Sequence, residues 1–116
     1  MLQGARRQMN QKDFEGVIAA RLEKIRSILL AKNAEYAPGA DKLANFKSGG
    51  QLLRCTPERA LVGYLAKHLV SVLDKVDDLN CGLLAGEAIW DEKIGDSINY
   101  LILLECLISE RLEKSK

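Results

Sequence analysis

The 116-residue sequence has little of what disulfide-bonded, zinc-binding or strand-rich proteins need. Its three cysteines, Cys55, Cys81 and Cys106, form no Cys-x-x-Cys pair, which argues against a disulfide framework and indicates reduced thiols in a cytoplasmic protein. The single histidine leaves no His and Cys set for zinc. Because only two prolines interrupt the chain and β-branched alternation is absent, we expect an all-α fold.

Net charge and long apolar runs are missing as well. The 17 Lys and Arg against 16 Asp and Glu leave a net charge of +1, so no overall field would attract nucleic acid. No apolar run reaches the roughly 18 residues of a membrane span, and residues 1–10 lack the apolar core of a signal peptide. We therefore expect no membrane or nucleic-acid partner, a flexible tail over residues 1–10, and one domain over residues 11–116.

Apolar residues at helical spacing predict three long helices, at about residues 12–33, 57–80 and 89–113. Thr56 is a suitable N-cap and Pro57 a suitable first residue for the middle helix, and Gly82 suits a left-handed C-cap. Between the first two helices, residues 40–55 are predicted as a long connection, a kind of loop that often carries function. The apolar stripes expected to face the core are Phe14, Val17, Ile18, Leu22, Ile25 and Leu29; Leu61, Leu65, Leu69, Val72, Val76 and Leu79; and Trp90, Ile94, Ile98, Leu101 and Ile108.

The short link after the middle helix predicts an antiparallel hairpin, with the first helix packed against it as a bundle of three long helices. Residues 101–108 of the last helix are apolar nearly all round. That is more apolar surface than two neighbouring helices can cover, so we expect a homo-oligomer, most simply a dimer.

Carboxylates gather where the two helices of this hairpin meet. Glu92, Asp96 and Asn99 share a stripe that leads into Leu103 and Cys106, so Asp96 needs a partner. An antiparallel hairpin brings the end of the middle helix towards that stripe. The acids brought there are Asp74, Asp77 and Asp78. Clustered oxygen ligands of this kind suit Mg²⁺ or Mn²⁺, which commonly bridges to phosphate.

Ordinary structural roles compete with each of these interpretations. The middle-helix aspartates could be solvated or paired with Lys75 or Lys93, and Asp96 could be a buried structural acceptor. His68 is expected at the edge of the core. At the end of the first helix, Lys32, Glu35 and Tyr36 could hold phosphate and stack a base, or simply complement the helix dipole and cover the core.

These motifs resemble the MazG-like all-α nucleoside triphosphate pyrophosphohydrolases, and more closely the phage-type proteins called nucleotide modification associated domain 1. The resemblance spans about residues 14–107. It is carried by Lys32-x-x-Glu35-Tyr36, Asn45-Phe46, Asp74-Lys75 and Asp96-Ser97-Ile98-Asn99-Tyr100. In place of the family's Glu-Glu-x-x-Glu, this chain has Asp74-x-x-Asp77-Asp78.

The resemblance implies a Mg²⁺-dependent nucleotide-binding protein that cleaves between the α and β phosphates. Asp74, Asp78, Glu92 and Asp96 would then be metal ligands, with Asp74 and Asp96 catalytic. The expected substrate-binding residues are Lys32, Glu35, Tyr36, Lys67, Asn99 and Tyr100. The competing hypothesis is a non-catalytic helical interaction module, whose acids form ion pairs and whose surplus apolar surface binds itself or another protein.

Overall fold

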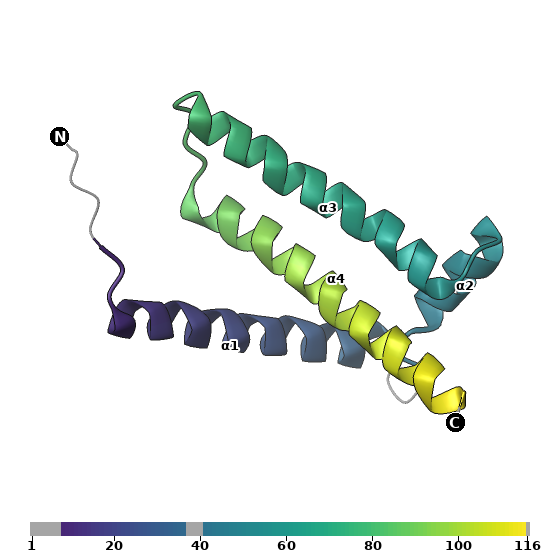
Figure 1. Cartoon of the computed structure of the whole chain (residues 1–116). Coiled ribbons are helices and arrows are strands. Elements are labelled where there is room, and N and C mark those ends of the chain that lie inside the picture. Colours follow the sequence, from purple (N-terminus) through teal and green to yellow (C-terminus); the bar gives the residue numbers. More distant parts are fainter. Residues whose placement is uncertain (1–7, 37–40, 116) are drawn as a thin grey trace.

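The structure is a computed structural model that describes residues 8–36 and 41–115, with side chains for residues 8–31 and 41–115. These residues form four helices and no strand, which confirms the all-α prediction (Figure 1). The helices are α1 (Gln11–Tyr36), α2 (Ala44–Leu53), α3 (Pro57–Asn80) and α4 (Glu87–Lys114). Of the tail predicted over residues 1–10, residues 1–7 lie outside the described residues.

Helices α3 and α4 form the predicted antiparallel hairpin (Figure 1). At its start, the Thr56 hydroxyl accepts the Arg59 backbone N–H at 3.1 Å, which caps α3 as expected. At its end, Gly82 adopts a φ of 82°, and the Leu83 N–H donates to the Asp78 carbonyl at 2.8 Å. This is the hydrogen bonding of a Schellman motif, so both ends of α3 are set by the residues that predict them.

Helix α2 corrects the prediction of an irregular connection over residues 40–55. The Asp41 carboxylate accepts the Leu43 N–H at 2.9 Å just before the helix, and Leu43 and Phe46 turn inward to the core. The chain leaves α2 through Arg54, at a φ of 57°, and doubles back closely past Gly50. Adjacent glycines such as Gly49 and Gly50 usually indicate a loop. In this structure Gly50 instead permits a tight turn from α2 to α3, because it has no Cβ.

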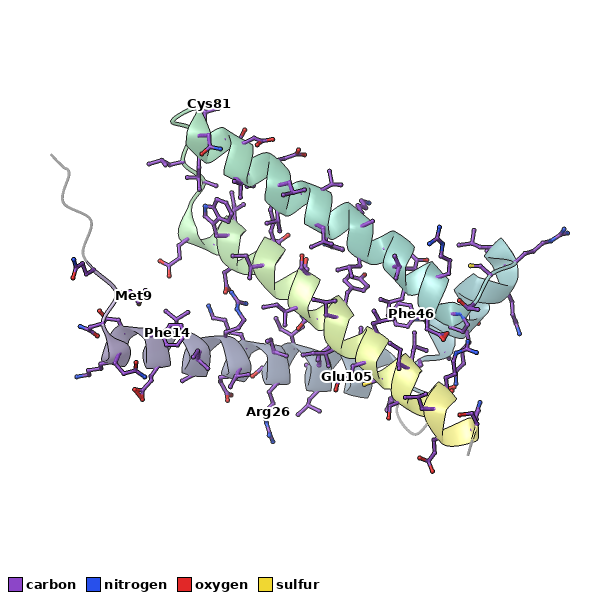
Figure 2. All side chains as sticks on the ribbon, in the orientation of Figure 1. Met9, Phe14, Arg26, Phe46, Cys81 and Glu105 are labelled. Carbon is purple, nitrogen blue, oxygen red and sulfur yellow. The ribbon has the colours of Figure 1, made fainter. Side chains whose placement is uncertain are left out.

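The core lies at the end of the hairpin that α2 covers. It consists of Leu43, Leu61, Leu65 and Leu107, with four partly buried residues packed against it. Those four are Phe46, Tyr100, Leu103 and Leu104. Figure 2 shows Phe46 beside both α3 and α4, where it extends this core. The core is therefore small, and it depends on α2.

Helix α1 lies beside α4, on the side away from α3, and runs in the same general direction as α4 (Figure 1). Among the described residues, α1 packs against α4, one helix of the hairpin, and has no comparable contact with α2 or α3. Arg21 donates to the Asp91 carboxylate at 2.7 Å, Lys24 lies 3.0 Å from the same carboxylate, and Ile25 is buried one turn further on. Two ion pairs to Asp91 and the buried Ile25 thus hold α1 against α4.

Much of the apolar surface predicted to be buried is exposed in this single chain. On α1, Phe14, Val17 and Leu22 are each more than half exposed, and Phe14 stands at the start of α1 away from the other helices (Figure 2). The last-helix stripe expected to face the core is corrected too, because Leu101 and Ile108 are exposed. The reason is geometric: an open arrangement with a radius of gyration of 17.8 Å, where a compact chain of this length has about 13 Å, offers these side chains no neighbour. No described helix combines the length and apolarity that crossing a membrane requires.

The turn at Gly50 gives a stability prediction. A Cβ at Gly50 would lie 2.8 Å from the Cys55 carbonyl oxygen and 3.0 Å from the Pro57 nitrogen, both backbone atoms that cannot yield easily. Gly50→Ala should therefore lower the free energy of unfolding by about 1–3 kcal/mol in urea titrations followed by circular dichroism. Gly49→Ala is the matched control, because its Cβ would meet only side-chain atoms at ordinary contact distances, Ala60 Cβ at 3.8 Å and the Tyr64 hydroxyl at 4.0 Å, and it should be neutral or stabilising by up to about 1 kcal/mol. Equal effects of the two changes would contradict the close turn.

The contact of α1 with α4 predicts a pH dependence. Hydrogen bonding from Lys24, together with the charges of Lys24 and Arg21, lowers the pKa of Asp91. The unfolded chain, with an aspartate pKa of about 3.9, then binds a proton more readily than the folded chain. This stabilisation is complete above the unfolded pKa of about 3.9 and is lost as pH falls through the lower, folded pKa.

Asp91→Asn should therefore reduce the free energy of unfolding at pH 7 and flatten the decline of stability in acid. Glu92→Gln, at the exposed neighbouring position, should leave the acid decline unchanged. Parallel acid profiles for wild type and Asp91→Asn would refute this role.

Candidate functional site

Three contacts in register run along one side of the α3/α4 hairpin. The Lys93 ammonium donates to the Ser71 hydroxyl, His68 Nδ1 lies 3.7 Å from Asp96 Oδ2, and the Tyr64 and Tyr100 rings stack with centroids 6.4 Å apart. We call these six residues, Tyr64, His68 and Ser71 of α3 with Lys93, Asp96 and Tyr100 of α4, the Asp96 row. Each helix places its members three or four residues apart, which puts them on one face.

Asp96 is the central acid of this row. Its side chain is 34% exposed, so part of the carboxylate faces solvent and part lies against the hairpin. The basic side chain beside it among the described residues is His68, and no lysine or arginine of that part of the chain pairs with it. A carboxylate without a permanent cation beside it has acceptor capacity for a ligand, a metal ion or water.

His68 was predicted only as a residue at the edge of the core, and its position in the row went unrecognised. The sequence did not reveal this position, because the pairing of residue 68 with residue 96 depends on the register between α3 and α4. The imidazole also contacts the Tyr100 ring, with centroids 4.9 Å apart. His68 therefore lies between the Asp96 carboxylate and the Tyr100 ring and is close to both.

Aromatic rings extend the row towards α2. Tyr100 lies edge-on to Phe46 at 6.4 Å, and Phe46 lies edge-on to Tyr64 at 6.3 Å. Burial, and next the nearby charge of Asp96, raise the pKa of Tyr100 above its usual value. Phe46 was missed as part of this group because its segment was predicted to be a loop. Half-buried rings beside a carboxylate can stack a planar ligand while the acid accepts its donors.

Among the described residues, no three of the predicted metal ligands Asp74, Asp78, Glu92 and Asp96 are grouped to hold a metal ion. Asp78 lies 3.3 Å from Lys75, as the ion-pair alternative expected, while Asp74 and Glu92 are exposed. Asp74 follows His68 by six residues, or about 9 Å along the helix axis, which exceeds the reach of one coordination sphere. Within residues 8–36 and 41–115, no three His, Cys, Asp or Glu side chains are grouped to hold a metal ion.

The predicted substrate-binding residues divide into three groups. Tyr100 belongs to the row, and Asn99 is buried on the neighbouring face of α4, with an amide oxygen that accepts no hydrogen bond from the described residues. An unpaired buried acceptor of this kind costs about 1–3 kcal/mol, so Asn99 has capacity for a donor. Lys67 is exposed beside His68. Lys32, Glu35 and Tyr36 form the last turn of α1, and their side chains lie outside the described residues.

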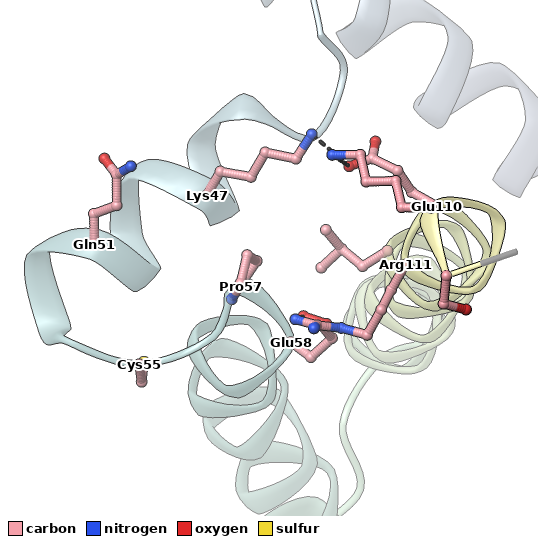
Figure 3. A pocket seen from close by; sticks show the side chains of 10 residues that line it. Lys47, Gln51, Cys55, Pro57, Glu58, Glu110 and Arg111 are labelled. Atoms are coloured by element: carbon pink, nitrogen blue, oxygen red, sulfur yellow. Dashed lines mark hydrogen bonds and ion pairs between the residues drawn. The ribbon is translucent and has the colours of Figure 1, made fainter.

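A separate hollow of about 560 Å³ lies where α2, the start of α3 and the end of α4 meet (Figure 3). Lys47 pairs with Glu110 at 2.6 Å and also with Asp41, while Arg111 donates twice to Glu58 at 2.6 and 2.8 Å. These hydrogen bonds lower the pKa of both glutamates. These ion pairs satisfy one another's charges, so the cluster connects α2 and α3 to α4. None of the predicted site residues lines the hollow.

The neighbourhood of Asp96 and Tyr100 can be tested without any ligand. Asp96→Asn removes a negative charge that raises the pKa of Tyr100, so the Tyr100 pKa should fall towards 10. The measurement is an NMR titration of selectively ¹³C-labelled tyrosine rings. Glu105→Gln, an exposed acid on the same helix, is the control and should leave the Tyr100 titration unchanged. An unmoved Tyr100 pKa in Asp96→Asn would contradict the geometry of the row.

Comparison with known proteins adds no identity to this geometry. No family model, curated protein or solved structure matches the chain. The likeness to MazG-like enzymes rests on the sequence motifs quoted above, and the function argued next rests on those motifs together with the Asp96 row.

Proposed function

We propose that this protein is a MazG-like nucleotide-binding protein whose ligand site is the Asp96 row, and that it acts as a homo-oligomer. The single observation that carries the proposal is the half-buried Asp96 carboxylate beside stacked aromatic rings, with no lysine or arginine of the described residues paired to it. A nucleotide offers the complementary groups, namely a planar base and a phosphate chain that arrives with a divalent cation.

Each side chain of the row has a distinct task in this proposal. Tyr100 and Tyr64 present ring faces for the base, while His68 contacts both Tyr100 and Asp96 and keeps the acid beside the rings. Lys67, exposed next to His68, supplies positive charge for phosphate. Asn99, one turn beyond Asp96, offers its unpaired amide oxygen to a donor on the ligand or to water.

Magnesium would be held in this arrangement by Asp96 and by the ligand's own phosphate oxygens. That coordination suits Mg²⁺, which usually keeps several waters and takes only one or two protein carboxylates alongside phosphate. A bound cation would neutralise phosphate charge and polarise water, the chemistry that hydrolysis between the α and β phosphates needs. Asp74, Asp78 and Glu92 would reach the same cation only in a different arrangement of the helices or from another copy of the chain.

A second candidate function is supported by a different observation. Phe14, Val17 and Leu22 of α1 are more than half exposed, which leaves an apolar surface of the kind that marks protein contacts. On that basis the chain would be a non-catalytic helical interaction module, and its acids would only keep the free surface soluble.

Ligand-dependent melting separates the two candidates. Thermal unfolding is measured with Mg²⁺ or Mn²⁺ and a panel of ribo- and deoxyribonucleoside triphosphates, with released pyrophosphate assayed in parallel. A nucleotide at 100 times its dissociation constant adds about 2.7 kcal/mol to stability, enough to raise the melting temperature by several degrees. Asp96→Asn should abolish this shift and retain the helical circular dichroism spectrum, while Glu105→Gln should keep the shift. Melts that no nucleotide changes, or a full shift in Asp96→Asn, would reject the nucleotide site in favour of the interaction module.

A further inference from the structure

The α3/α4 hairpin carries a regular set of exposed aliphatic residues on the side opposite the Asp96 row. On α3 these are Val62, Leu69 and Val76, and on α4 they are Ile94, Leu101 and Ile108. Each of the six is between 38% and 50% exposed. Members of each set stand seven residues apart, close to two helical turns, so each set forms one straight line. We call these six residues the apolar flank.

The register of the hairpin places the two lines on the same side. On α3, Val62 directly follows the fully buried Leu61, whereas Tyr64 directly precedes the buried Leu65. On α4, Ile108 directly follows the buried core residue Leu107, whereas Tyr100 stands two turns before Leu107 and faces the Tyr64 ring of α3. In two antiparallel right-handed helices that face each other, residues that follow the buried positions lie on one side and residues that precede them lie on the other. The apolar flank is therefore separate from the Asp96 row.

A line of aliphatic residues every seven positions is the pattern of helices that pack against further helices. In this chain, α1 packs on α4 and α2 packs on α3, yet all six side chains of the flank stay partly open to solvent. Contiguous apolar surface of this kind is uncommon on monomeric proteins and typically marks an interface. The flank therefore has the features of one half of a helix–helix contact.

We propose that the α3 line of the apolar flank, Val62, Leu69 and Val76, docks against the same line of a second copy, with a twofold axis near Leu69. Val62 and Val76 each stand seven residues from Leu69, so an antiparallel pair of α3 helices places Val62 against the partner's Val76. The same axis brings Arg59 opposite the partner's Asp77. Arg59 and Asp77 are exposed, and neither forms an ion pair with another described residue, so each has its charge available for this contact.

Helix α3 has 24 residues and is about 36 Å long, and the line from Val62 to Val76 covers about 21 Å of it. The docking specifies the surface of the proposed oligomer, and it does not depend on whether the Asp96 row binds a nucleotide.

The first test measures molecular mass without any nucleotide, by sedimentation equilibrium of the full chain. Wild type should be dimeric at micromolar concentration. Leu69→Glu places two carboxylates at the axis and should weaken the dimer at least tenfold, with the helical circular dichroism spectrum retained. The control is Leu22→Glu on α1, which is 61% exposed and lies outside the flank, and it should leave the dimer intact. A monomeric wild type, or a dimer broken by Leu22→Glu and unaffected by Leu69→Glu, would overturn the proposal.

The second test uses charge reversal, which perturbs only exposed residues. Arg59→Glu and Asp77→Arg should each raise the dimer dissociation constant about fivefold, because each places like charges together at both ends of the α3 contact. The double variant restores opposite charges and should return the constant to near the wild-type value. Purely additive weakening in the double variant would overturn the antiparallel arrangement about Leu69.

Discussion

The antiparallel register of α3 and α4 is the constraint on which the rest of this structure depends. Helix α3 begins at the Thr56 hydroxyl, which accepts the Arg59 N–H, and ends at the left-handed Gly82. Packing of α3 against α4 then puts His68 across from Asp96 and Tyr64 across from Tyr100. The same register turns one side of the hairpin into a polar and aromatic surface and leaves the other side aliphatic.

The remaining helices are attached to this hairpin by ionic contacts as much as by apolar packing. Helix α2 brings Leu43 and Phe46 to a small core, and Lys47 with Glu110 and Arg111 with Glu58 close its edge. Helix α1 depends on Arg21 and Lys24 at Asp91. Partly exposed ion pairs contribute little individually, so a chain with this few buried aliphatic residues gains substantially from any further contact that covers its open faces.

The two sides of the hairpin suit two different kinds of partner. The Asp96 row combines an acid that lacks a lysine or arginine partner among the described residues with rings that can stack, which suits a small planar ligand with a cation. The apolar flank has evenly spaced aliphatic residues, with an acid and a base placed near its two ends, which suits another helix pair. Ligand binding and assembly can therefore occur at the same time, because neither surface covers the other.

The sequence by itself determined the all-helical class, both ends of α3 and the partial burial of Asp96, because helical periodicity, a capping hydroxyl and a glycine with positive φ act over a few neighbouring residues. Only the tertiary structure decided that residues 44–53 are helical, since α2 is stabilised by the core it covers and by a turn at Gly50. Tertiary structure likewise decided that Asp74, Asp78, Glu92 and Asp96 form no metal-holding group of three among the described residues and that His68 is the neighbour of Asp96. Spacing along one helix predicts which face of that helix a residue occupies. The distance between residues on two different helices depends on the register between the helices, which the sequence pattern does not give.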